Sequence, residues 1–262
     1  MKERADKIVV DRGLAKSQHE AQALIMAGAV FSGEKRIEKP GEKLHIEQEI
    51  VVKEKMPFVG RGGLKLEEAL DAFKIFLTGK VAADLGASTG GFTDCLLQRD
   101  VRKVYAVDVD TRQIDQRLRE DPRVILIEKN ARYLVADDFD DLLDLVTLDL
   151  SFISVLKVLP ALREFLGEGL LVALIKPQFE AGKGQVGKKG VVRDPGLHQE
   201  VLIRVVDEAE RMGFYPRGLI RTSIRGQKGN QEFFILWSLH GPTLHPEQLK
   251  ILIKEAVWNE KS

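Results

Sequence analysis

From about residue 63 onward, short apolar runs alternate with segments whose apolar residues recur every three to four positions. Apolar runs of this length predict buried strands, and the longer periodic segments predict amphipathic helices. Strands that alternate with helices predict a doubly wound, mostly parallel, Rossmann-like α/β sheet covered by helices on both faces. The expected strands are 81–86, 103–110, 123–130, 145–152, 169–179 and 232–239, and the expected helices include 63–73, 92–100 and 197–213.

The first 55 residues show a different pattern, two short helices followed by small alternating strands. Gly13 is placed to end the first helix, Ser17 to cap the second and Gly28 to end it. The segment after residue 29 alternates apolar and polar residues around Gly33, as strands joined by turns do. We therefore expect a small α+β domain at 1–55, an interdomain linker at 56–62, where proline and glycine interrupt both periodicities, and a larger domain at 63–262.

Charge and cysteine content narrow the class of protein. Forty basic residues balance forty acidic ones, so any surface that binds nucleic acid must be local. Cys95 stands alone and the five histidines lack metal-ligand spacing, which argues against a disulfide framework and against a metal site. The N-terminus carries charges throughout and the longest apolar run is LLVALI, so the sequence predicts neither a signal peptide nor a membrane span. We expect a cytoplasmic protein.

The stretch DLGASTGGFTD, which begins at Asp84, predicts a ligand-binding turn. Glycine lets the backbone approach a ligand closely, but the spacing here is not that of a dinucleotide fingerprint. Asp108 ends the next strand, where an acid pairs with ribose hydroxyls in nucleotide-binding folds. Together these features favour S-adenosylmethionine, whose ribose and cationic groups both suit carboxylates. The alternative is a glycine-rich turn without a ligand.

Polar residues also follow the other strands, at the edge where ligands bind in such sheets. Asn130, Asp149 and Lys176 each come at or just after an apolar run. Desolvation would lower the pKa of Lys176 and let its amine accept a proton, while a nearby Asp149 would oppose that shift and orient the amine. Taken singly, each residue fits an ordinary surface or salt-bridge side chain better, and it is their joint placement that favours a site.

Several motifs, in this order along nearly the whole chain, resemble those of the TlyA, or hemolysin A, family. They are RADKIVV with GLAKSQHEAQALIMAGAVFSG, then FVGRGGLKLEEAL, DLGASTGGFTD, YAVDVD, KNAR, DLSFIS, LIKPQFEAGK and RGQKGNQEFF. The resemblance implies an S4-type RNA-binding domain fused to an FtsJ-like, RrmJ-type methyltransferase domain. Gln18 departs from the pattern, because S4 domains usually carry an arginine at this position.

The same resemblance implies an S-adenosylmethionine-dependent 2'-O-methyltransferase of ribosomal RNA, with cytidine ribose as acceptor. The family's Lys-Asp-Lys-Glu tetrad falls on Lys65, Asp149, Lys176 and Glu232. Lys176 would assist deprotonation of the 2'-hydroxyl, Asp149 would orient Lys176, and Lys65 and Glu232 would position the nucleotide. The short extension before the S4 motif favours the large ribosomal subunit. The tetrad needs no metal.

The remaining predicted site residues fall into two sets. Basic residues cluster around the tetrad positions, with five against one acid between Lys176 and Arg193 and five against none between Arg211 and Gln231. Such clusters fit phosphate contacts. The expected cofactor site comprises Asp84, Gly86, Ala87, Ser88, Thr89, Gly90, Gly91, Phe92, Asp108, Asn130 and Asp149. The expected RNA contacts are Lys16, Lys35, Arg36, Arg61, Lys183, Lys188, Lys189, Arg193, Arg221, Arg225 and Lys228, with Phe152 and Phe179 as candidates for base stacking or core packing.

Other functions stay open at this point. A catalytically silent S4-containing protein that binds RNA or ribosomes would have the same domains. A membrane-lytic hemolysin is disfavoured because the sequence has no long apolar span and no large cationic amphipathic helix. An NAD-dependent oxidoreductase shares the fold class, but the glycine spacing disfavours it.

Overall fold

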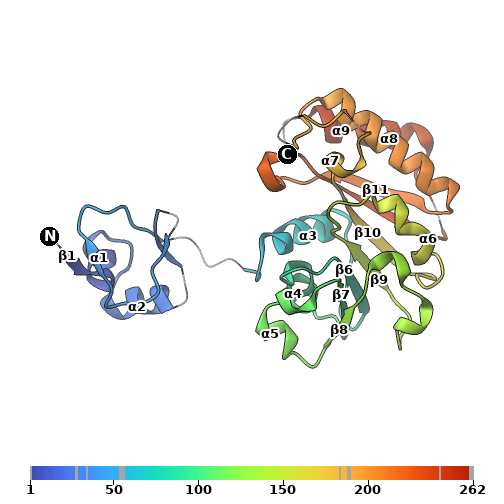
Figure 1. The fold of residues 1–262 in the computed structure, drawn as a ribbon. Coiled ribbons are helices and arrows are strands. Elements are labelled where there is room, and N and C mark those ends of the chain that lie inside the picture. Colours follow the sequence, from blue (N-terminus) through green and yellow to red (C-terminus); the bar gives the residue numbers. More distant parts are fainter. Residues whose placement is uncertain are drawn as a thin grey trace. The chain divides into compact units, whose positions relative to one another are not determined.

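A computed structural model describes residues 2–26, 29–33, 35–52, 57–182, 184–187, 190–241 and 243–259, with Gln227 described by its backbone alone. The chain divides into two compact units, Met1–Pro57 and Phe58–Ser262 (Figure 1). The division lies inside the predicted linker 56–62, whose last residues already belong to the first turn of a helix that begins at Arg61. Gly28 lies outside the described residues.

The first unit is a small α+β domain, as the sequence predicts. Gly13 has a φ of +70° and its N–H donates to Val10, which ends the first helix. Ser17 Oγ accepts the N–H of Glu20 at the start of the second helix. Within the described residues β1 pairs with β4, and β2 pairs with both β3 and β5, all antiparallel. The elements are β1 (Lys2–Arg4), α1 (Ala5–Asp11), α2 (Gln18–Met26), β2 (Val30–Ser32), β3 (Lys35–Arg36), β4 (Lys43–His45) and β5 (Val51–Val52).

The second unit contains a sheet of seven described strands in the order β11-β12-β10-β9-β6-β7-β8. Strands β10, β9, β6, β7 and β8 are parallel, and β12 runs antiparallel to β10 and β11. The predicted fold class is therefore confirmed. The strands are β6 (Val81–Leu85), β7 (Lys103–Asp108), β8 (Val124–Glu128), β9 (Leu145–Leu148), β10 (Leu170–Ile175), β11 (Tyr215–Arg221) and β12 (Phe233–Ser238).

Helices cover both faces of this sheet (Figure 1). On one face α6, α8 and α9 pack on alternate strand residues such as Leu85, Val107 and Trp237. On the other face α3, α4 and α5 pack on the intervening residues, such as Ala82 and Val172. No helix in the described ranges is long and apolar enough to cross a membrane. The α-helices are α3 (Arg61–Ala72), α4 (Gly91–Gln98), α5 (Gln116–Arg119), α6 (Leu159–Leu162), α7 (Pro177–Glu180), α8 (Pro195–Arg211) and α9 (Pro246–Trp258), and the 3₁₀ turns are η1 (Thr111–Gln113), η2 (Ala131–Tyr133), η3 (Ala136–Asp138), η4 (Val155–Lys157) and η5 (Gln227–Gly229).

Candidate functional site

The turn between β6 and α4 forms the floor of a cavity at the carboxyl edge of the sheet. Gly86 has a φ of +88°, and a Cβ at this position would lie 2.7 Å from the backbone oxygen of Asp149. Only glycine therefore allows β6 to turn so close to the end of β9. The N–H of Ser88 then donates to Asp108 Oδ2 at 2.8 Å, which joins the turn to the end of β7.

This glycine-turn cavity has a volume of about 440 Å³ and combines carboxylates with apolar side chains. Asp108 and Asp149 line it together with the side chain of Asn130, whose Oδ1 also accepts the N–H of Arg132. Of the predicted cofactor residues, Gly86 and Ser88 also line the cavity. Phe152, predicted as a candidate for base stacking, also lines it. Its other members were not predicted from the sequence and are Val107, Val109, Gln113, Lys129, Ala131, Leu150, Ser151, Ile153 and Val158.

Asp84 occupies a different place from the one its motif suggests. Its side chain is fully buried beneath the turn, where Thr93 Oγ1 donates to Oδ2 at 2.7 Å and Thr147 Oγ1 donates to Oδ1 at 3.1 Å. Burial raises the pKa of the Asp84 carboxyl to about 7, against the opposing effect of the two hydroxyls. Through these two hydrogen bonds, the carboxyl links β6 to α4 and to β9. The other predicted cofactor residues that do not line the cavity are Ala87, Thr89, Gly90, Gly91 and Phe92.

A second cavity, of about 420 Å³, adjoins the first and is rich in cations. Lys65, Lys176 and Glu232 all line this lysine cavity, and Asp149 lines both cavities. The shared wall consists of Gly86, Ser88, Asp149, Ser151 and Phe152. The other residues that line the lysine cavity are Arg61, Gly62, Gln178, Phe179, Val186, Gly190, Gly226, Lys228 and Asn230.

The four tetrad positions form two ion pairs. Lys176 Nζ lies 2.6 Å from Asp149 Oδ1, and Lys65 Nζ lies 2.6 Å from Glu232 Oε2. The side chains are mostly buried, with exposed fractions of 11% for Lys176 and 2% for Glu232. Lys176 Nζ also donates to Ser151 Oγ at 3.1 Å. Low exposure shields both pairs from solvent screening, so each lysine is held in a fixed position by its partner.

Two aromatic rings border the lysine cavity. Phe152 has a φ of +65° and is 88% exposed, and its ring centroid lies 5.1 Å from that of Phe179. Lys176 Nζ lies 5.9 Å from the centroid of Phe179. A large apolar side chain this exposed, on a backbone conformation that non-glycine residues rarely adopt, is a feature of binding sites more than of cores.

Glu180 joins the two loops that carry Asp149 and Lys176. Its carboxylate accepts Ser154 Oγ at 2.7 Å and the N–H of Val155 at 2.8 Å. Burial raises the pKa of this carboxyl. Neither Glu180 nor Gln178 was predicted from the sequence, although both lie within four residues of Lys176 in the motif KPQFE. Gln178 Oε1 is buried without a hydrogen-bond partner in the described part of the chain.

The structure distributes the predicted RNA contacts over three places. Arg61 and Lys228 line the lysine cavity. Arg193, Arg221 and Arg225 line another cavity on the same unit. In the first unit Lys16, Lys35 and Arg36 are exposed, with Lys35 paired to Glu42 at 2.9 Å. Lys183, Lys188 and Lys189 lie outside the described residues.

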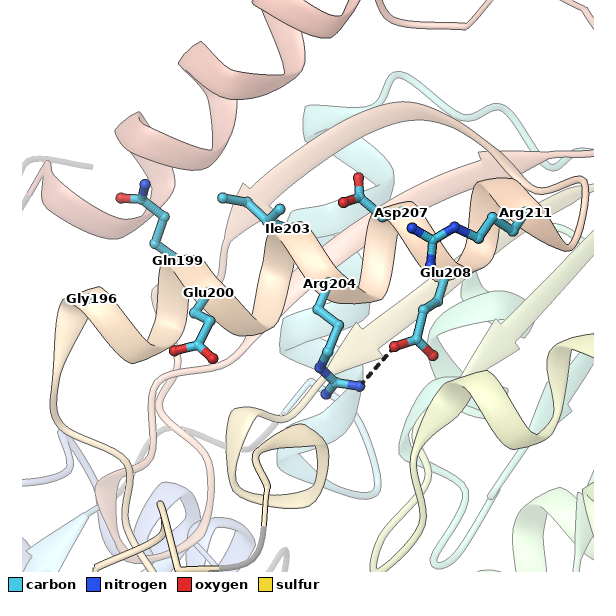
Figure 2. Close-up of a pocket in the computed structure, with 8 residues that line it drawn as sticks. All are labelled: Gly196, Gln199, Glu200, Ile203, Arg204, Asp207, Glu208 and Arg211. Atoms are coloured by element: carbon cyan, nitrogen blue, oxygen red, sulfur yellow. Dashed lines mark hydrogen bonds and ion pairs between the residues drawn. The ribbon is translucent and has the colours of Figure 1, made fainter.

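The outer face of α8 carries a separate depression of about 540 Å³ (Figure 2). Its side chains project from one helix, and Arg204 and Glu208 pair across one turn at 3.3 Å. It contains none of the predicted site residues. Across the described residues, no group of three or more histidine, cysteine, aspartate or glutamate side chains could hold a metal ion. The depression is lined by Gly196, Gln199, Glu200, Ile203, Arg204, Asp207, Glu208 and Arg211.

The sheet, with its single antiparallel strand β12 among the described strands and its cavities at the carboxyl edge, is that of a Rossmann-like methyltransferase. The family model for FtsJ-like methyltransferases matches residues 58–239, and the model for the S4 domain matches residues 3–50. The chain belongs to the TlyA, or hemolysin A, family of FtsJ-like methyltransferases with an S4 domain. The predicted resemblance and the prediction of a methyltransferase are both confirmed.

Individual relatives align over most of the chain. Protein YqxC of Bacillus subtilis is 44% identical over 97% of this chain and 94% of its own length. The 16S/23S rRNA (cytidine-2'-O)-methyltransferase TlyA of Mycobacterium tuberculosis is 42% identical over 89% of this chain and 88% of its own. A Streptococcus thermophilus structure solved under the name hemolysin is 41% identical, with a TM-score of 0.74 over 97% of this chain and 95% of that one.

Proposed function

We propose that this protein is an S-adenosylmethionine-dependent 2'-O-methyltransferase that acts on cytidine ribose in ribosomal RNA. One observation carries the proposal: an acid-lined cavity and a cation-lined cavity share a wall at Asp149. Transfer of a group between two bound molecules requires two sites that meet at the reacting atoms. A methyl donor in the first cavity and a nucleotide in the second would meet beside Lys176.

The glycine-turn cavity suits S-adenosylmethionine. Asp108 is placed for ribose hydroxyls, since each of its oxygens accepts one backbone N–H and retains further acceptor capacity. The apolar side chains of Val107, Val109 and Ile153 suit the adenine ring. Asp149 favours a cationic ligand. When bound, the cofactor supplies a methyl group that is already activated, so the protein's main task is alignment.

In the lysine cavity, Lys176 would assist deprotonation of the ribose 2'-hydroxyl. Asp149 holds Nζ at 2.6 Å and would orient it. Lys65 and Glu232, as a fixed pair on the opposite wall, would position the nucleotide. Phe152 is placed for a base to stack on, and the buried Oε1 of Gln178 would be satisfied by a donor on the nucleotide.

The nature of the acceptor rests on the relatives and on the first unit. The Mycobacterium tuberculosis relative is named for methylation of cytidine ribose in both ribosomal RNAs, which supports the same acceptor here. The S4 domain supports RNA as the partner. Lys16, Lys35 and Arg36 in that domain, together with Arg61, Lys228 and the sequence-predicted Lys183, Lys188 and Lys189, would contact phosphates. The preference for the large subunit remains a prediction from the sequence.

The decisive experiment measures transfer of radiolabelled methyl from S-adenosylmethionine to purified small and large ribosomal subunits. Nuclease digestion then locates the label on ribose or base. Lys176→Ala should reduce transfer at least about 100-fold, as expected for loss of an acid–base group. Lys157→Ala, at an exposed lysine outside both cavities, serves as the control and should keep full activity.

Each outcome has a distinct meaning. Label on cytidine ribose that is lost in Lys176→Ala supports the proposal and identifies the subunit. Label on a base would overturn the assignment of the 2'-oxygen as acceptor. Cofactor binding without transfer to either subunit would favour the second candidate, an S4-containing RNA-binding protein without activity on the ribosome.

A further inference from the structure

A third cavity, of about 760 Å³, lies in the second unit where the C-terminal part of α9 meets the start of α8. Arg221, at the end of β11, and Arg225, in the following loop, line it opposite Arg193. Trp258 lies at its rim, 52% exposed, with its indole N–H donating to Gln199 at 2.9 Å. We call it the arginine cavity, and its described lining is Arg193, Pro195, His198, Arg221, Arg225, Gln231, Val257, Trp258 and Asn259.

The described lining of this cavity is positively charged. Its lining contains no aspartate or glutamate among the described residues, and none of its arginines forms an ion pair with a described carboxylate. The contacts of Arg221 and Arg225 are long ones to backbone oxygens, at 3.5 Å to Asn259 and 3.4 Å to Gly229. Three guanidinium groups around one cavity, without a described carboxylate partner, favour an anionic ligand.

His198 does not add to this charge. Burial lowers the pKa of its imidazole, and the nearby charges of Arg221 and Arg225 lower it further, whereas a hydrogen bond of Nε2 with the backbone oxygen of Val192 opposes the shift. The ring is therefore neutral near pH 7. The arginines give the described lining its positive charge, although Asp194 beside it also acts on His198 and raises the pKa of the imidazole. A guanidinium fork matches the oxygens of a phosphate.

The loop between β11 and β12 separates this cavity from the lysine cavity. Arg225 and Gln231 line the arginine cavity, whereas Gly226, Asn230 and Glu232 line the lysine cavity. None of the residues that the structure describes lines both cavities. A ligand long enough to cross this loop would therefore place one part in each cavity, and the loop would lie between the two parts.

We propose that the arginine cavity binds a backbone phosphate of the RNA strand that carries the acceptor nucleotide. The proposal rests on the function proposed above and adds a second contact point, on the far side of the β11–β12 loop from the tetrad. Because a phosphate is common to every nucleotide, this contact fixes the path of the strand and carries no information about the base.

The test compares two variants that each lose two positive charges. Arg193→Gln/Arg225→Gln removes cations from the cavity, and Arg119→Gln/Lys157→Gln removes exposed cations elsewhere on the same unit. Loss of the cavity cations should raise the KM for ribosomal RNA at least about 10-fold. It should also reduce the slope of log affinity against log salt by about one to two units, at unchanged kcat and cofactor affinity. Equal KM values and salt slopes in the two variants would overturn the proposal.

A second readout separates this proposal from the catalytic one. Trp237 is fully buried, so a fluorescence change on titration with a ribosomal RNA fragment should come from Trp258. We expect a saturable change that disappears in Trp258→Phe and shifts to higher RNA concentration in Arg193→Gln/Arg225→Gln. If the protein transfers no methyl group but the titration shows this saturable change, the proposed methyltransferase activity is overturned and the proposed phosphate site in the arginine cavity is supported. If the protein transfers methyl groups but the titration shows no fluorescence change, only the proposed phosphate site is overturned.

Discussion

At the scale of single residues, Asp84 differs most from what its sequence context suggests. An acid at the end of a strand, before a glycine turn, is typical of a residue that contacts the ligand. Here the carboxyl lies under the turn and binds Thr93 and Thr147. Sequence could predict the turn, because glycines at Gly86 and Gly90 are local signals. It could not predict the burial of Asp84, because Thr147 lies on another strand and meets it only in the folded sheet.

Burial of Asp84 gives a pH dependence of stability that can be measured. Its pKa is raised to about 7 in the folded protein, against an ordinary value of about 3.9 in the unfolded chain. Between pH 4 and pH 7 the unfolded chain releases this proton while the folded protein keeps it, so raising the pH through this range favours unfolding. The loss is on the order of 4 kcal/mol across the whole range.

Asp84→Asn removes the titrating carboxyl group. It retains a side-chain carbonyl oxygen that can accept a hydrogen bond from the hydroxyl of Thr93 or Thr147. We expect the free energy of unfolding of the wild type to fall, relative to that of the variant, as the pH rises from 4.5 to 7.5. Urea unfolding of both proteins at several pH values measures the difference. A difference that does not change with pH would show that Asp84 is ionised throughout.

At the scale of secondary-structure elements, the turn between β6 and α4 passes close to the residue that follows β9. Gly86 and Gly79 both have positive φ angles, of +88° and +75°, but a Cβ at Gly79 would meet no atom within 4 Å. The two glycines therefore separate the effect of backbone conformation from the effect of crowding against Asp149.

We expect Gly79→Ala to cost about 1 kcal/mol, for the left-handed conformation alone. Gly86→Ala should cost about 1–3 kcal/mol more, because its Cβ would displace the end of β9. It should also weaken S-adenosylmethionine binding at least about 10-fold, whereas Gly79→Ala should leave binding unchanged. Urea unfolding and calorimetric titration measure both effects, and equal costs would contradict the role assigned to crowding.

Strand β11 marks the limit of pattern-based prediction at this scale. The sequence predicts the strands β6, β7, β8, β9, β10 and β12, all of which are mostly apolar. It does not predict β11, where Pro216, Arg217 and Gly218 break the alternation. The register shifts between Pro216 and Gly218, and the strand pairs with β12 alone, at the edge of the sheet. An edge position tolerates a proline and an irregular register, which sequence periodicity alone cannot anticipate.

At the scale of the whole molecule, the two units have separate cores. The core of the first unit contains Ile8, Val9 and Ile25, and the clusters on the two faces of the large sheet lie entirely in the second. Phe58 belongs to the second unit, where it packs against Gly63 of α3. Each unit therefore contains the apolar contacts that it needs to fold.

We expect the fragment 58–262 to fold alone and to bind S-adenosylmethionine within about twofold of the affinity of the full chain. Its KM for ribosomal RNA should rise at least about 10-fold, because the fragment lacks the basic residues of the S4 domain. Circular dichroism, calorimetry and the methyl-transfer assay measure the three properties. An unfolded fragment would contradict the independence of the two cores, and an unchanged KM would contradict a role of the S4 domain in RNA binding.

The four charged tetrad positions could be predicted from the sequence, but their pairing and the neighbouring Gln178 and Glu180 could not. Resemblance to a family placed the four charged residues, and the structure joins Lys65 to Glu232 across 167 positions of sequence. No local pattern contains that contact, because it depends on where β12 enters the sheet. The division into two cavities around Asp149 likewise depends on tertiary contacts that no local sequence pattern contains.

The position of β12 bears on how the protein is made. Glu232 immediately precedes β12, which pairs with both β10 and β11. A ribosome synthesises the chain from its N-terminus, so Lys65, Asp149 and Lys176 emerge well before Glu232. Until β12 is added, Lys65 lacks its partner and β10 remains an open edge that invites wrong pairing. A nascent copy therefore lacks a complete lysine cavity until Glu232 and β12 have joined the fold.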